Sequence, residues 1–226
     1  MPNDTQSPGF GERTLGNIAS SLPGATSVFR AFKLDFCCGG DVVLAAAARK
    51  QGLDPELVVR ELETLAASDK AVSPELDTAS MISKILTRYH EVHRRELPEL
   101  FKLACKVEAV HGDHLSAPHG LADTLQEMVG ELEVHMKKEE LILFPAMLRN
   151  AGSPLSAPIS QMRHDHDDHG AHLRRLDEIT HGFELPEGAC RSWQVLYAGT
   201  RKLADDLVEH IHLENHILFP RFEAER

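Results

Sequence analysis

Residues 135–145 read HMKKEELILFP, and residues 210–220 read HIHLENHILFP. A histidine, a glutamate four places later and an Ile-Leu-Phe-Pro ending therefore recur after 75 residues. Another histidine precedes each copy at nearly the same spacing, since His90 lies 45 residues before His135 and His166 lies 44 residues before His210. The repetition predicts two related helix pairs, each with one histidine on its first helix and a histidine–glutamate pair on its second. Two such pairs can close around two metal ions.

The spacing within each copy brings the two polar side chains to one face of a helix. Positions i and i+4 differ by about 40° in direction and about 6 Å along the axis, so His135 and Glu139 can aim at one point, as can His210 and Glu214. A glutamate on an apolar helix face is costly unless it is paired or binds a cation. The apolar residues on these faces are Leu132, Met136, Leu143 and Met147 in the first copy and Leu207, Ile211, Leu218 and Phe219 in the second.

The pattern suits two ions, with histidines at the two ends and with Glu139 and Glu214 as bridges in the middle. Imidazole and carboxylate ligands suit iron, manganese and zinc alike, so the spacing leaves the metal open. The alternative is two solvated histidine–glutamate pairs on a duplicated helix hairpin. The duplication argues against it, because it preserves the ligand types together with the apolar residues.

The remaining histidines near the two motifs also need an assignment. Within the histidine-rich stretch 164–169, only His166 has the 44-residue spacing to the second copy. His93 and His169 each follow a predicted ligand by three residues, which leaves a supporting role open for both. His212 lies about 200° around the helix from the ligand His210 and cannot serve the same ion. We expect His212 and His216 to share an outward, solvated face, and the alternative is that the pair binds a stray metal ion at the surface.

Composition excludes several classes of protein. The 226 residues include 42% apolar residues, enough for one large core or two small ones. Acidic residues outnumber basic residues 35 to 24, and the formal charge of −11 argues against nucleic acid or an anionic membrane surface as a partner. The sequence contains no run of about 18 apolar residues, so it predicts no membrane-spanning helix. The first residues do not resemble a signal peptide, so we expect a cytoplasmic protein.

Helical periodicity without strand-like alternation predicts an all-α protein. Long helices joined by short connections rich in Gly and Pro indicate an up-down-up-down four-helix bundle, preceded by a small helical domain. The four long helices are expected near 77–111, 119–149, 155–181 and 188–218. The expected division is a disordered start at 1–13, the small domain at 14–67, a linker at 68–76 and the bundle at 77–226.

Four cysteines in a cytosolic chain indicate reactive or metal-binding thiols rather than a disulfide framework. Cys37 and Cys38 precede Asp41, which we expect to cap a helix. A helix N-terminus lowers the pKa of a nearby thiol and makes the thiolate available as a ligand or nucleophile. The alternative is a tight turn in which both thiols only pack. We expect Cys105 and Cys190 to be core residues.

The C-terminal region resembles a hemerythrin-like domain, and the chain from Thr14 onward resembles the bacterial di-iron proteins that repair iron–sulfur clusters (the RIC family, including ScdA-, YtfE-, DnrN- and NorA-like proteins). Together the motifs are highly specific, although a histidine–glutamate pair alone is not. They are Asp-Phe-Cys-Cys-Gly-Gly at 35–40, Arg-Tyr-His-x-x-His-Arg at 88–94, Leu-Pro-Glu-Leu at 97–100, the two repeated motifs, and His-Asp at 166–167.

The resemblance implies two non-haem iron ions per chain. Oxygen-carrying hemerythrins place a second histidine four residues after the first on their third helix, whereas Gly170 stands at that position here. The missing ligand favours a labile or reactive iron site over a reversible oxygen carrier. The implied iron ligands coincide with those chosen by spacing: His90, His135, Glu139, His166, His210 and Glu214.

The resemblance also implies a function. The expected activity is repair of iron–sulfur clusters damaged by nitric oxide or peroxide, through donation of labile iron, and damaged iron–sulfur proteins are the expected partners. Cys37 or Cys38 would pass or trap iron or nitric oxide, no residue is assigned as catalytic, and the protein would be a monomer or a homodimer. The alternative is a scavenger, sensor or reductase that binds nitric oxide at the same centre. Such a reductase would be an enzyme, whereas the repair protein would not be a conventional one.

Overall fold

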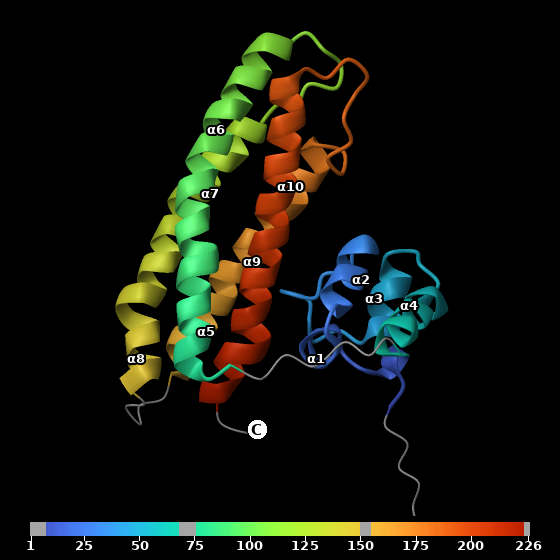
Figure 1. The fold of residues 1–226 in the computed structure, drawn as a ribbon, viewed down its shortest axis with the longest axis vertical. Coiled ribbons are helices and arrows are strands. Elements are labelled where there is room, and N and C mark those ends of the chain that lie inside the picture. The colour runs from blue at the N-terminus through green and yellow to red at the C-terminus, as the bar shows by residue number, and fades with distance from the viewer. Residues whose placement is uncertain (1–7, 68–75, 150–154, 224–226) are drawn as a thin grey trace, which may run out of the picture. The chain divides into compact units, whose positions relative to one another are not determined.

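The computed structural model describes residues 8–67, 76–149 and 155–223 (Figure 1). Within these ranges every regular element is a helix, and the sole β-type pairing is an isolated antiparallel bridge between Thr14 and Val43. The predicted all-α class is therefore confirmed. No helix in the described part of the chain combines the length and the apolar character that crossing a membrane requires.

The contacts within the chain divide it into two compact units. The first comprises residues 1–76 and 211–221, and the second comprises residues 77–210 and 222–226. The division falls within the last long helix, after His210, whereas the sequence predicted one bundle over 77–226. The predicted linker at 68–76 lies, apart from its last residue, outside the described residues.

The helices of the first unit follow local sequence signals. Thr14 is the N-cap of the first of them, and its side chain accepts a hydrogen bond from the backbone N–H of Asn17. Gly24 supplies the left-handed residue before the second, at φ 91°. The elements are η1 (Phe10–Glu12), α1 (Leu15–Ser21), α2 (Ala25–Ala31), α3 (Leu44–Lys50) and α4 (Pro55–Ala67). Their shared core includes Leu15, Ile18, Phe29, Phe36, Leu44 and Leu62.

Two expectations for this region are wrong. The start of the chain is not disordered throughout 1–13, because η1 is a 3₁₀ turn that packs against α3 and α4. Asp41 does not cap the third helix, which begins at Leu44 with Val43 as its N-cap. Val43 is extended, and the carbonyl of its neighbour Val42 accepts a hydrogen bond from the backbone N–H of Leu15. β-Branched valines favour this extended backbone over another helical turn.

The rest of the chain forms four long helical stretches, at 78–111, 121–149, 156–179 and 191–218, each end within three residues of its predicted position. Figure 1 shows α6, α7, α9 and α10 running side by side, and α7 contacts both α6 and α9. The segments are α5 (Thr78–Ile85), η2 (Leu86–His90), α6 (Glu91–His111), α7 (Leu121–Lys138), η3 (Glu139–Leu143), α8 (Phe144–Arg149), α9 (Ser156–Ile179), α10 (Arg191–His212), η4 (Leu213–Leu218) and η5 (Phe219–Phe222).

The apolar faces predicted around the two repeated motifs are buried. Their eight side chains all lie in the core: Leu132, Met136, Leu143, Met147, Leu207, Ile211, Leu218 and Phe219. The inward phase of the motif helices is therefore as predicted.

Local signals determine where two of these helices begin. The Asp77 side chain accepts a hydrogen bond from the backbone N–H of Ser80 at 2.7 Å, and Gly120 adopts φ 86° before α7.

Three of the four long stretches contain a π-helical segment: η2, η3 and η4. His90 is the last residue of η2, Glu139 is the first of η3, and Glu214 is the second of η4. A π segment accommodates an extra residue in a helical turn and changes the direction of its side chains, and such segments are frequent at functional sites. The helix that carries His166, α9, is α-helical over its whole length.

Candidate metal centre

The six residues predicted as metal ligands lie together and are buried. Their potential ligand atoms form two groups of four, and within each group all atoms lie within 4.8 Å of one another. Both groups contain Glu139 and Glu214. The first group adds His90 and His210, and the second adds His135 and His166. The geometry is that of two adjacent cation positions with two carboxylates in common.

The histidines of each group point the same ring nitrogen at each other. The Nε2 atoms of His90 and His210 lie 3.2 Å apart, as do those of His135 and His166. Two nitrogen ligands about 2.0–2.1 Å from one ion lie roughly 2.8–3.4 Å apart for ligand angles between octahedral and tetrahedral. The imidazole pairs therefore have the separation that a shared metal ion requires.

Glu139 lies between the two histidine pairs. Its Oε2 atom is 3.4 Å from Nε2 of His90 and 3.4 Å from Nε2 of His135, one histidine from each group. Its side chain is fully buried, and a buried carboxylate is stable only when cations or strong donors compensate its charge. The donor set of imidazoles and shared carboxylates fits non-haem iron.

A carboxylate outside the centre orients His90. Nδ1 of His90 lies 2.8 Å from Oε1 of Glu140. Arg94 donates hydrogen bonds to the same carboxylate, at 2.7 Å to Oε1 and at 3.1 Å to Oε2. Although burial opposes ionisation of Glu140, the hydrogen bonds from Arg94 and His90 lower its pKa. An ionised Glu140 accepts a hydrogen bond from Nδ1–H of His90, so the Nε2 lone pair faces the centre.

Asp165 plays the same part for His135. Nδ1 of His135 lies 3.3 Å from Oδ2 of Asp165, which also accepts a hydrogen bond from Lys138 at 2.7 Å. Oδ1 of Asp165 accepts a hydrogen bond from Gln161 at 2.8 Å. The hydrogen bond from His135, followed by those from Lys138 and Gln161, lowers the pKa of Asp165 despite its partial burial. One histidine of each group is thus held by an ionised carboxylate.

Sequence reasoning missed both of these carboxylates. Glu140 directly follows Glu139, and Asp165 directly precedes His166, so each adjoins a predicted ligand in sequence. Adjacency to a ligand was the available signal, but it does not say which histidine the carboxylate meets. Glu140 contacts His90 on another helix, 50 residues away.

His93 and His169 lie beside the centre without hydrogen bonds to it. The ring of His93 lies 5.5 Å from that of His210, and the ring of His169 lies 4.9 Å from that of His135. Both nitrogens of His93 and Nε2 of His169 are buried without a hydrogen-bond partner. Burial, followed by the neighbouring imidazoles, lowers the pKa of His93 to about 3 and that of His169 to about 2. Both rings are therefore neutral at pH 7.

The expectation of an outward, solvated face for His212 and His216 is wrong. His212 is buried and His216 is half-buried, and both belong to the stretch of helix that clusters with residues 1–76. Within that unit the rings of His212 and Phe36 meet edge to face at 5.4 Å, and Nε2 of His216 lies 3.2 Å from the carbonyl oxygen of Cys37. The predicted direction relative to His210 agrees with the structure, since neither histidine joins a ligand group.

Cys37 and Cys38 form a third group of potential ligands with Asp35, within the first unit. Oδ1 of Asp35 accepts hydrogen bonds from the backbone N–H groups of Cys38 and Gly39, and the two Sγ atoms lie 3.6 Å apart without a disulfide bond between them. The expected lowering of the thiol pKa is wrong for Cys37. The hydrogen bond with Cys38, then burial and the charge of Asp35, raise its pKa, and no helix begins beside it.

The other two cysteines are not core residues, contrary to expectation. Cys105 is exposed, and Cys190 is half-buried with its Sγ atom 3.1 Å from Nε2 of His111. Both thiols lie on the long helices or their connections rather than in either ligand group.

Comparison with known proteins adds two matching family models. The description "Hemerythrin HHE cation binding domain" applies to residues 81–222, which contain all six residues of the centre. Residues 11–66 match the ScdA N-terminal model, a domain of unknown function (DUF542). The two matches together cover both helical regions of the chain.

The chain is also similar over nearly its whole length to curated bacterial proteins. It is 47% identical over 214 residues to the iron–sulfur cluster repair protein YtfE of Pectobacterium carotovorum, covering 94% of this chain and 97% of that protein. With the same coverage it is 44% identical to the YtfE protein of Yersinia pseudotuberculosis and 42% identical to that of Dickeya chrysanthemi. These three relatives carry the same name.

Proposed function

This chain belongs to the family of YtfE-type iron–sulfur cluster repair proteins, and we propose that it repairs damaged clusters by supplying iron from a centre of two non-haem ions. The observation that carries the proposal is the pair of four-residue groups with two carboxylates in common. The proposed place of action is the cytoplasm, as expected from the sequence, and the proposed partners are proteins with damaged clusters.

Six residues would hold the iron. His90 and His210 would bind one ion, His135 and His166 the other, and Glu139 and Glu214 would bridge the two. A damaged cluster has lost iron, so the protein would have to bind iron and then release it to the cluster. Glu140 and Asp165 hold two imidazoles in the tautomer that offers Nε2 to the ion, and both remain ionised at pH 7.

The same donor set supports a labile centre. Each group offers two imidazoles of its own and two carboxylates, and the carboxylates are common to both groups. Iron commonly takes more than four ligands, so positions remain for exogenous groups that can replace protein ligands one at a time. Gly170, four residues after His166, provides no further side chain on α9.

We assign Cys37 and Cys38 the transfer role in this proposal. The two thiols and Asp35 offer a soft, compact ligand group that differs from the histidine–glutamate centre. Thiolates bind iron strongly, and clusters themselves are held by thiolates. The raised pKa of Cys37 means that this thiol would lose its proton only on binding a cation.

One experiment tests the proposed function directly. The protein is loaded anaerobically with ferrous iron, its iron content is measured, and it is mixed with an iron–sulfur enzyme whose cluster has been damaged by nitric oxide. Recovery of the enzyme's activity, with matching loss of iron from the protein, is the expected result. Two bound irons with no recovery would contradict repair while leaving the centre intact.

A second candidate is nitric oxide binding, with scavenging, sensing or reduction as its outcome. The observation that favours it is a 670 Å³ pocket whose lining includes His135, through which a small molecule could reach the centre. Titration of the reduced protein with nitric oxide separates the two functions. Catalytic turnover to nitrous oxide would support a reductase, and stoichiometric binding without turnover would support a scavenger or sensor.

A further inference from the structure

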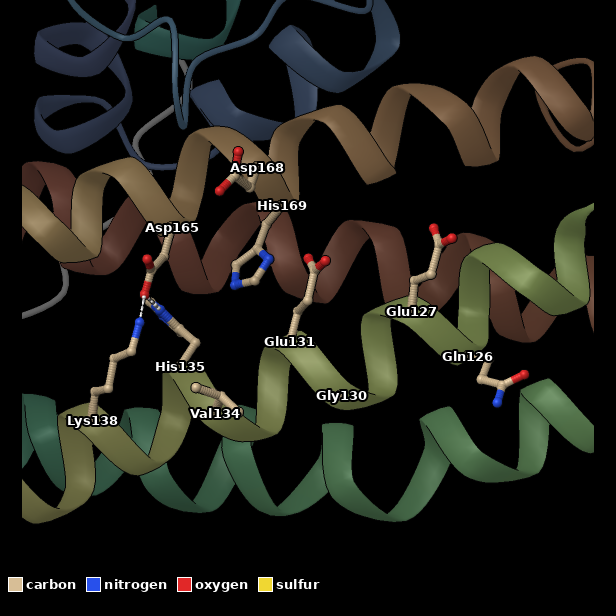
Figure 2. A pocket seen from close by; sticks show the side chains of 10 residues that line it. All are labelled: Gln126, Glu127, Gly130, Glu131, Val134, His135, Lys138, Asp165, Asp168 and His169. Atoms are coloured by element: carbon tan, nitrogen blue, oxygen red, sulfur yellow. Dashed lines mark hydrogen bonds and ion pairs between the residues drawn. The ribbon is translucent and has the colours of Figure 1, made fainter.

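The 670 Å³ pocket lies between α7 and α9 (Figure 2). Its lining includes the exposed residues Glu127, Glu131 and Asp168 and the buried residues His135 and His169. The pocket therefore leads from the surface of the second unit to the edge of the His135–His166 group. No function discussed so far uses His169.

His169 is an unusual residue to find at the inner end of a pocket. Its side chain is 3% exposed, and its Nε2 atom has no hydrogen-bond partner. Figure 2 shows the ring reaching from α9 toward α7, while Glu131 reaches from α7 toward α9 beside it. The ring stands at 88° to that of His135, 4.9 Å away between centroids. A buried nitrogen without a partner costs free energy, so it needs a compensating role.

His93 provides the structural comparison. It follows His90 by three residues, as His169 follows His166, and it too is buried with nitrogens that lack hydrogen-bond partners. His93 does not line this pocket. Packing beside a ligand imidazole is therefore common to both positions, whereas contact with an open pocket distinguishes His169.

The charges around the pocket favour a cation. Its lining contains the four carboxylates of Glu127, Glu131, Asp165 and Asp168 against the single ammonium group of Lys138. Lys138 is engaged with Asp165 at 2.7 Å, and Glu131 accepts a hydrogen bond from His172 at 2.8 Å at the rim. Field lines from carboxylates in a pocket raise the local concentration of cations.

Carboxylates alone do not make a metal site, but here an imidazole lies at their inner end. Imidazole nitrogen combined with carboxylate oxygen and water selects divalent transition-metal ions over calcium or magnesium. The second, independent observation is thus the side chain of His169, which lines the same pocket, is 3% exposed and has an Nε2 atom without a hydrogen-bond partner.

We propose that His169 and Glu131 form a separate binding position for one hydrated divalent transition-metal ion, next to the dinuclear centre. His169 supplies the imidazole, and Glu131 supplies a carboxylate directly or through water. Because only two protein ligands hold the ion, binding at this position is weak. Weak binding suits a transient site for ions that enter or leave the centre. The proposal rests on the proposed function in one respect, because it takes the centre itself to hold two ions.

Manganese(II) is a suitable probe, because the electron paramagnetic resonance signal of the free ion reports how much remains unbound. Protein with two irons per chain, verified by metal analysis before and after the titration, is titrated with Mn²⁺. The expected result is one additional saturable ion per chain in the unmodified protein. In crystals soaked with Mn²⁺, anomalous scattering should locate it beside His169.

Three variants make the test specific. His169→Gln should keep both irons and lose the additional Mn²⁺. Glu131→Gln, at an exposed position, should weaken binding of the additional Mn²⁺ about tenfold. His164→Gln changes an exposed histidine on the same helix that does not line the pocket, and should bind as the unmodified protein does.

Four outcomes would overturn the proposal. These are no additional ion in the unmodified protein, unchanged binding in His169→Gln, an anomalous peak only at the surface carboxylates, and loss of a centre iron from His169→Gln. The last would make His169 a ligand of the centre itself. Failure to load two irons in the unmodified protein would instead count against the proposed function, so the two failures are distinguishable.

Discussion

The imidazole of His90 and the carboxylate of Glu140 meet at 2.8 Å, at the junctions where α6 follows η2 and where η3 follows α7. The same carboxylate forms a two-point ion pair with Arg94, one turn after His90. Glu140 therefore joins two helices of the bundle and at the same time determines which nitrogen of His90 faces the centre. Its contribution to metal binding can be separated from its contribution to folding.

Glu140→Gln should weaken iron binding by roughly 10–100-fold, because a neutral amide holds the Nδ1 proton of His90 less strongly than a carboxylate does. Iron affinity is measured by competition with a chromogenic chelator. Glu133→Gln is the matched control, since Glu133 contacts Arg94 at 2.7 Å but does not contact His90. Equal loss of affinity in both variants would show that only the Arg94 ion pairs matter.

Glu139→Gln should reduce iron content to less than one ion per chain, a larger effect than that of Glu140→Gln. The amide keeps the size of the side chain but removes the negative charge that both ligand groups share. Loss of a buried charge need not harm the metal-free fold, so the helical circular dichroism should persist. Metal analysis after anaerobic reconstitution checks the prediction, and two retained irons would exclude Glu139 as a bridge.

The sequence predicted the helices from local periodicity, and it selected the six candidate ligands from the i, i+4 pairs and from the 45- and 44-residue spacings of His90 and His166. A histidine and a glutamate four residues apart on an apolar face must project into the bundle, whatever the loops do. The buried faces around Leu132 and Leu207 agree with that reasoning. The 75-residue repetition then pairs the two motifs without any knowledge of the fold.

Features that depend on contacts between distant segments could not be predicted in the same way. The π segments that contain His90 and Glu139 have no sequence signal of their own. The burial of His212 arises from its ring contact with Phe36, 176 positions earlier in the chain. Asp41 looked like a helix cap because its residue type is common there, but the bridge between Val43 and Thr14 keeps the backbone extended, and the helix begins only at Leu44.

Asp206→Asn should destabilise the protein by about 1–2 kcal/mol at pH 7 and by less at pH 3. Although burial opposes ionisation of Asp206, hydrogen bonds from Arg88 and Lys202 lower its pKa. A carboxyl group with a lowered pKa stabilises the fold above its unfolded pKa of about 3.9, and this contribution disappears as the pH falls through the folded value.

Urea denaturation at both pH values measures the effect of Asp206→Asn. Glu99→Gln is the control, because Glu99 and its partner Lys102 are both largely exposed and contribute little. A destabilisation by Asp206→Asn that is the same at pH 3 and pH 7 would show that the ionised carboxylate is not what stabilises the fold.

His212→Ala should keep both irons while lowering the stability of the protein by about 1–3 kcal/mol. The side chain is buried against Phe36 and belongs to neither ligand group, so its removal leaves a cavity in the first unit only. His216→Ala should likewise keep both irons. Iron content and the thermal unfolding midpoint of each variant are compared with those of the unmodified protein. Loss of iron at either position would place it among the ligands.

The double variant Cys37→Ala/Cys38→Ala should keep the iron content and optical spectrum of the unmodified protein but lose several-fold in the rate of cluster repair. Neither thiol belongs to the histidine–glutamate groups, so the centre does not need them to bind iron. In transfer they would offer replacement ligands before the imidazoles release the ion, which lowers the barrier to release. Cys105→Ala/Cys190→Ala removes the same number of thiols elsewhere and should repair clusters at the normal rate. Equal repair rates for the two double variants would show that Cys37 and Cys38 only pack within the backbone turn that contains them.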